Sequence, residues 1–147
     1  MSAWTEEQPM RVAFAAICEG ETPWVALGNF SNDFFPNEDR REALIKDPIE
    51  EPQGVSVELH RWAVFCAASV EYLCHKYDLT VPDWVYSYPP LEDQWFHSHA
   101  ESNPVRRERY LRTTPPEFAL RNIYCGDRIW QDKHEEAAKL QQRLLSA

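Results

Sequence analysis

The stretch VSVELHRWAVFCAASVEYLCHKYD, residues 55–78, places the strongest constraint on the fold. Large apolar side chains recur through it at steps of three or four residues, which is the period of one face of an α-helix. Small apolar side chains at Ala63 and Ala67 widen this stripe around the helix. A helix that is apolar on several sides is normally surrounded by other elements. The sequence therefore predicts a central helix over residues 56–77.

Shorter helical patterns flank this segment, and most of them begin at a capping residue or a proline, as helices commonly do. They fall at residues 10–17, 22–35, 37–47, 103–112, 114–123 and 128–145. The last pattern follows a stop at Gly126 and a cap at Asp127, and it places Trp130, Ala137 and Leu144 on one face. The segment 79–102 has no helical period, contains Pro89 and Pro90, and is expected to be irregular.

With only 4 Gly, the chain has too few for a turn-rich all-β fold. Its 19 aromatic side chains, 6 Trp, 6 Tyr and 7 Phe, each bury a large area, so a few short helices suffice to close a core. We therefore predict an all-α protein: a compact bundle of about five to seven helices, with residues 1–147 forming a single domain.

Charge is divided unevenly along the chain. Residues 1–101 carry 18 acids against 6 Lys and Arg, a formal charge of −12, whereas residues 102–147 carry 6 acids against 9 Lys and Arg, a charge of +3. The acidic majority argues against general binding to nucleic acid or to anionic membranes. The basic minority leaves room for a local site that accepts an anion.

The arginines after residue 101 are the most informative candidates. Three of them recur at steps of three on one face of the helix expected at 103–112, and aromatic rings precede them in the irregular segment. Arginine, tyrosine and tryptophan dominate the energetic centres of protein interfaces. The predicted contact surface lies within 84–121 and comprises Arg106, Arg109, Arg112, Arg121, Trp84, Tyr88 and Trp95. The alternative reading is that the arginines pair with carboxylates of their own chain, which would add little stability.

Catalytic and metal motifs are weak by comparison. The sequence has no Cys-x-x-Cys, no Gly-x-Ser-x-Gly and no glycine-rich phosphate loop. His97 and His99 are the only candidate pair of metal ligands or proton-transfer groups, because alternate residues of an extended segment point the same way. Cys125, beside Gly126 at the start of the last helix, is a minor candidate nucleophile. We predict no metal and no cofactor.

Three further features bear on the cellular location. The longest apolar run, WAVFCAASV, is about half of the ~20 residues that cross a bilayer, and Glu6 and Glu7 stand where a signal peptide is positively charged. The four scattered cysteines are typical of buried thiols in a reducing compartment. We expect a cytoplasmic protein that does not bind membranes.

The motifs WVALGNFSNDFF, EYLCHKYDLTVPDWV and TPPEFALRNIYCGDRI, with Trp95-Phe96 between the last two, occur here in one order. In that order the chain, over residues 24–130, resembles a widespread set of small bacterial proteins to which no activity is attached. Some members of that set occur in toxin–antitoxin or helix-turn-helix gene contexts. The resemblance implies a bacterial protein in a partner-binding role.

Two functional hypotheses follow. The first is a non-enzymatic protein that binds another macromolecule, such as an antitoxin-like or accessory subunit, through the Arg and aromatic residues of 84–121; we expect a protein partner rather than nucleic acid. The second is an enzyme directed at a phosphate or nucleic acid, with His97 and His99 acting beside the arginines. The first requires that the arginines are open to solvent.

Overall fold

The central helix predicted from the sequence is present as α4, Val57–Tyr77, in the computed structural model, which describes residues 6–146. The Ser56 hydroxyl caps its start by accepting a hydrogen bond from the Leu59 amide at 3.1 Å. Asp78 ends it in the left-handed conformation, with φ at 57°. Every residue from 63 to 70 is buried, so α4 is packed on all sides along its middle.

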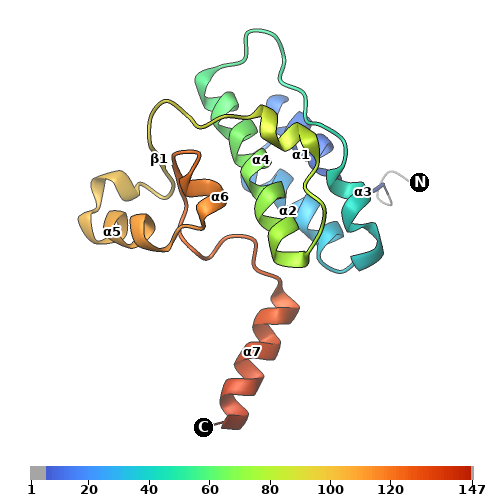
Figure 1. Cartoon of the computed structure of the whole chain (residues 1–147), viewed down its shortest axis with the longest axis vertical. Coiled ribbons are helices and arrows are strands. Elements are labelled where there is room, and N and C mark those ends of the chain that lie inside the picture. The colour runs from blue at the N-terminus through green and yellow to red at the C-terminus, as the bar shows by residue number, and fades with distance from the viewer. Residues whose placement is uncertain (1–5, 147) are drawn as a thin grey trace.

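The described residues form seven α-helices, and the fold is all-α with 61% of the chain helical. Figure 1 shows their arrangement. The remaining α-helices are α1 (Met10–Cys18), α2 (Pro23–Phe34), α3 (Arg41–Ile45), α5 (Pro104–Thr113), α6 (Pro116–Ala119) and α7 (Lys133–Ser146). Short 3-10 helices are η2 (Glu38–Arg40), η3 (Asp83–Ser87) and η4 (Ala100–Ser102). Two strands complete the set, β1 (Trp95–Phe96) and β2 (Ile123–Tyr124).

The N-terminal helices pack against one side of α4 (Figure 1). Met10, Phe14 and Ile17 are buried on α1 at the predicted helical spacing. Phe30 and Phe34 of α2 are fully buried and stack on each other with ring centroids 5.3 Å apart. This apolar cluster makes up much of the core around α4.

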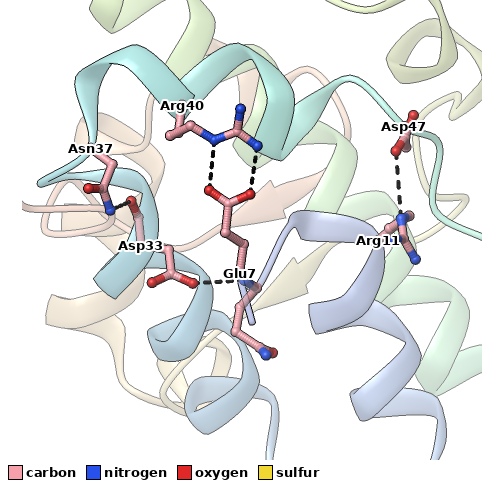
Figure 2. A network of polar contacts seen from close by, with 7 residues as sticks. Glu7, Arg11, Asp33, Asn37, Arg40 and Asp47 are labelled. Atoms are coloured by element: carbon pink, nitrogen blue, oxygen red, sulfur yellow. Dashed lines mark hydrogen bonds and ion pairs between the residues drawn. The ribbon is translucent and has the colours of Figure 1, made fainter. Parts of the chain in front are cut away.

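Polar contacts join the residues before and within α1 to α2 and to the residues that follow it (Figure 2). Glu7 accepts two hydrogen bonds from Arg40, at 2.7 and 2.8 Å, and Asp33 accepts one from the Gln8 amide at 2.7 Å. Arg11 lies 3.6 Å from Asp47. Arg11 and Arg40 are thus paired with carboxylates of their own chain.

The segment 79–102 is irregular, as predicted, apart from η3, η4 and β1. Trp84 of η3 packs against the core and donates its indole hydrogen to the Ile45 carbonyl oxygen at 3.0 Å. β1 pairs in parallel with β2, with Trp95 opposite Ile123. This long-range pairing joins the segment to the chain after α6 (Figure 1).

The predicted helices at 114–123 and 128–145 are partly wrong. The first is shortened to α6, because Asn122 has a left-handed φ of 66° and Ile123 joins the strand pair. The last begins at Lys133, so Trp130 does not share a helical face with Ala137 and Leu144. Trp130 instead takes a left-handed φ of 53°, is buried against Phe30, and donates a hydrogen bond to the Ser69 hydroxyl at 2.8 Å.

Two helices lie at the periphery. Neither α5 nor α7 contains a buried residue. Figure 1 shows α7 extending away from the other helices, with α5 beside α6 on the opposite side of α4 from α3. α7 is held near its start, where Glu135 accepts a hydrogen bond from the Tyr77 hydroxyl at 2.9 Å and lies 3.4 Å from Lys76. A peripheral helix can present its side chains to a partner without disturbing the core.

Candidate functional site

The arginine-bearing helix α5 is defined by its own caps. The Asn103 side chain accepts a hydrogen bond from the Arg106 amide at 3.1 Å, and Pro104 occupies the first helical position. The helix ends at Thr113, since Thr114 is extended and Pro115 follows. With no buried residue, the helix keeps its arginines at the surface.

The first two arginines of α5 bind back onto the loop before it. Arg106 donates a hydrogen bond from Nη1 to the Ser98 carbonyl oxygen at 2.8 Å. Arg107 places its guanidinium 5.1 Å from the centre of the Phe96 ring, a cation–π contact. These two side chains therefore have a structural role in holding α5 against β1 and η4.

Arg109 and Arg112, unlike Arg106 and Arg107, lie beside the turn that follows β2. They line a hollow of 260 Å³ together with Tyr110 and with Gly126 and Arg128 from the turn after β2. The arginine hollow, as we call this site, is defined by Arg109, Arg112 and Arg128. Asp127 also lines it. Among the residues that the structure describes, no carboxylate forms an ion pair with any of the three arginines.

Gly126 allows the turn after β2 to lie close to the Tyr110 ring of α5. A Cβ atom at this position would lie 3.0 Å from the Tyr110 ring, and its φ of 79° is one that other residues rarely adopt. Its amide donates a hydrogen bond to the Thr114 hydroxyl at 2.8 Å. The turn that carries Arg128 is thereby held against the end of α5.

Arg121 does not join the other three predicted arginines. It is 8% exposed. From Nη1 it donates to a Glu71 carboxylate oxygen at 2.7 Å and to the Glu117 carbonyl oxygen at 2.9 Å, and from Nε to the Tyr88 carbonyl oxygen at 3.3 Å. A guanidinium held in this way braces α4 against α6 and is closed to a partner.

The three predicted aromatic residues are also separated. Trp84 and Tyr88 are half-buried, with ring centroids 6.3 Å apart near η3, and burial raises the pKa of Tyr88 to about 12. Trp95 packs edge-on against Trp62 of α4 at 5.0 Å. None of these rings lines the arginine hollow.

His97 and His99 have different environments. Ser98 and His99 both have φ of 55°, so the segment is not extended and the expected alignment of the two imidazoles fails. His97 is buried among Trp24, Trp62, Phe65 and Trp95, and burial lowers its pKa to about 4. His99 is exposed.

Within residues 6–146, no group of three or more His, Cys, Asp or Glu side chains is placed to hold a metal ion.

The cysteines behave as small buried side chains. All four are free, and three of them are buried: Cys66, Cys74 and Cys125. Burial raises the pKa of Cys125 to about 12, so its thiol stays protonated near neutral pH.

Sequence reasoning missed Arg128 of the arginine hollow and three residues of a second pocket. Arg128 was assigned to the last predicted helix, and only the Gly126 turn hinted that the chain reverses there. Trp24, Glu58 and Arg61 line a pocket of 730 Å³ together with Trp62, Trp95 and His97, which we call the tryptophan pocket. No local pattern links these residues, because α2, α4 and the segment 94–101 supply them.

No protein-family model matches this sequence, and the chain has no significant match among curated proteins or solved structures.

Proposed function

We propose that this is a non-enzymatic binding protein whose arginine hollow receives an acidic segment of a protein partner. One observation carries the proposal: Arg109, Arg112 and Arg128 line one hollow, and none of them has an ion pair with its own chain in the described residues. Other basic side chains, such as Arg11, Arg40 and Arg121, do have such partners.

The chemistry of the hollow suits carboxylates. A guanidinium offers a planar fork of donors that matches the two oxygens of a carboxylate. Arg109 already lies 5.6 Å from the centre of the Tyr110 ring, which restricts the motion of its side chain and lowers the entropy lost on binding.

Charge favours a protein partner over nucleic acid. The arginines stand on a chain whose net charge is −9, and the first 101 residues repel a phosphate backbone. A short acidic segment needs to contact only the local positive surface. Within this class we favour an antitoxin-like or accessory subunit of a bacterial complex, which agrees with the resemblance in motif order.

We also propose that the protein is cytoplasmic and that it binds a partner rather than catalysing a reaction. The four free cysteines support a reducing, cytoplasmic setting. In the described part of the chain, no helix has both the length and the apolar character to cross a bilayer. The protonated thiol of Cys125 and the dispersed histidines support a role in binding rather than in catalysis.

The test measures binding of a fluorescent oligoglutamate peptide by anisotropy, with a short duplex DNA of matched label as the competing class. The double variant Arg109→Glu/Arg112→Glu should weaken peptide binding by at least about tenfold, because it removes two charge-assisted contacts and adds repulsion. DNA should bind more weakly than the peptide at equal salt.

The matched control is Lys46→Glu/Arg143→Glu, which makes the same change in net charge at two exposed positions away from the hollow. It should change the peptide's dissociation constant by no more than about twofold. Equal loss in the two double variants would show that only net charge matters and would reject the hollow. Tighter binding of DNA than of the peptide would reject the protein-partner assignment.

A further inference from the structure

The tryptophan pocket is independent of the arginine hollow and combines apolar walls with unused polar groups. Its volume of 730 Å³ lies within the range of pockets that hold small organic ligands. Trp24 of α2 and Trp62 of α4 contact each other edge-on at 5.4 Å, and Trp62 contacts Trp95 in the same way at 5.0 Å. Trp24 remains 50% exposed, so a broad indole surface is open to a ligand.

Polar side chains surround this indole surface without partners of their own in the described residues. Glu58, Arg61, Gln94 and Glu101 line the pocket, and none forms an ion pair or a side-chain hydrogen bond. Arg61 only lies 5.9 Å from the centre of the Trp95 ring. The pocket therefore offers a ligand two negatively charged hydrogen-bond acceptors, one positively charged donor and one neutral amide.

His97 provides a second, independent indication. Within residues 6–146 its Nε2 is the one buried side-chain nitrogen or oxygen without a hydrogen-bond partner. Its residue is 9% exposed, and it lines the pocket with its ring 4.4 Å from that of Trp95. Leaving such a group unpaired is costly, and each one in a native structure requires an explanation, such as a functional role or a partner from outside the chain.

The backbone beside His97 is also strained. Ser98 and His99, both pocket residues, have consecutive left-handed conformations with φ of 55°. Such conformations are unfavourable for residues other than glycine and persist where the surroundings enforce them. Here the Arg106 contact to the Ser98 carbonyl oxygen holds the loop in place.

The mixture of groups selects among ligand classes. An organic cation would satisfy the glutamates and leave Arg61 opposed, and an anion would do the reverse. A neutral ligand with many hydroxyl groups can donate to Glu58 and Glu101 and accept from Arg61. A ring with flat C–H faces would in addition pack against the indoles.

We propose that the tryptophan pocket binds a neutral sugar of about disaccharide size, with its ring faces on Trp24 and Trp95 and its hydroxyl groups on Glu58, Arg61 and Glu101. This site does not depend on the arginine hollow, so either assignment can fail without the other.

Intrinsic tryptophan fluorescence and calorimetry provide the test, with maltose, cellobiose, lactose, trehalose and N,N′-diacetylchitobiose as probes. Adenosine and tetramethylammonium chloride represent the stacking and cationic alternatives. At least one disaccharide should bind with a dissociation constant between about 10 µM and about 1 mM, which is the range expected for a small, polar ligand. Neither comparison compound should bind as tightly.

Trp24→Ala should raise that dissociation constant by at least about tenfold by removing the exposed indole face. Tyr86→Ala is the matched control, because Tyr86 is an exposed ring, 62% accessible, outside the pocket. It should change the constant by no more than about twofold.

If circular dichroism shows that Trp24→Ala is unfolded, Glu58→Gln serves instead, since Glu58 is exposed at the start of α4 and should cost about fivefold in affinity. Failure of every disaccharide at about 10 mM, unchanged affinity in the folded pocket variant, or tighter binding of adenosine or tetramethylammonium would overturn the assignment.

Discussion

At the residue scale, Arg121 and Arg112 have the same side chain and opposite environments. Arg121 is buried against Glu71, whereas Arg112 is exposed on α5. Sequence alone could not separate them, because the partner of Arg121 lies 50 residues earlier, on α4. What distinguishes the two is the tertiary packing of α6 against α4, which no local spacing encodes.

The first prediction concerns this buried pair. Arg121→Met should lower the free energy of unfolding by about 3 kcal/mol, because it leaves the Glu71 carboxylate without its counter-charge. The double variant Glu71→Met/Arg121→Met should recover at least about 1 kcal/mol of that loss, since no uncompensated charge remains. Urea denaturation of both variants measures this, and a double variant no more stable than the single one would contradict it.

His97 gives a prediction on pH dependence. Burial lowers its pKa from 6.5 to about 4, so between those pH values the unfolded chain binds a proton that the folded protein excludes. The free energy of unfolding should therefore fall as the pH drops through this window, by up to about 3 kcal/mol. The side chains packed around the imidazole are Trp24, Trp62, Phe65 and Trp95, and none of them is charged.

Denaturation at a series of pH values checks this prediction. His97→Phe should remove this decrease in the free energy of unfolding at low pH, because it deletes the titrating group from an apolar cluster. His99→Asn is the control: asparagine tolerates the left-handed conformation, so this variant should show the same decrease in the free energy of unfolding as the wild type. A His97→Phe protein with the wild-type pH dependence would assign the effect to another group.

At the element scale, sequence patterns succeeded where a segment's own periodicity determines its structure. The central helix α4 begins and ends within a residue of the predicted range, and α2 begins at Pro23 beside the expected cap. They failed where a distant contact overrides local preference. Trp130 leaves the last helix because its indole reaches Ser69 of α4, and Ile123 leaves α6 to pair with β1.

A truncation tests how the outer helix is attached. Ending the chain after Glu136 keeps the Tyr77–Glu135 hydrogen bond and removes exposed leucines such as Leu140 and Leu144. Because no residue of α7 is buried, the free energy of unfolding should fall by less than about 1 kcal/mol. Denaturation of the shortened chain measures this, and a loss of several kcal/mol would show that α7 packs on the body.

At the scale of the whole molecule, the packing of the helices separates the basic part of the chain from the acidic part. The uneven charge read from the sequence becomes a spatial feature, because α5 lies at the periphery and carries its arginines away from the acidic N-terminal elements (Figure 1). The sequence located this basic region and two of its three hollow residues. It could not supply Arg128 or the tryptophan pocket, since both depend on segments that meet only after folding.

The most direct measurement is an NMR titration of the arginine side-chain Nε–Hε resonances with an oligoglutamate peptide. We predict that the resonances of Arg109, Arg112 and Arg128 shift together in a saturable way, whereas that of Arg121, already bound to Glu71, does not move. Shifts confined to arginines outside the hollow, or no shift at a saturating peptide concentration, would contradict the claim that these guanidinium groups form an open site for an acidic partner.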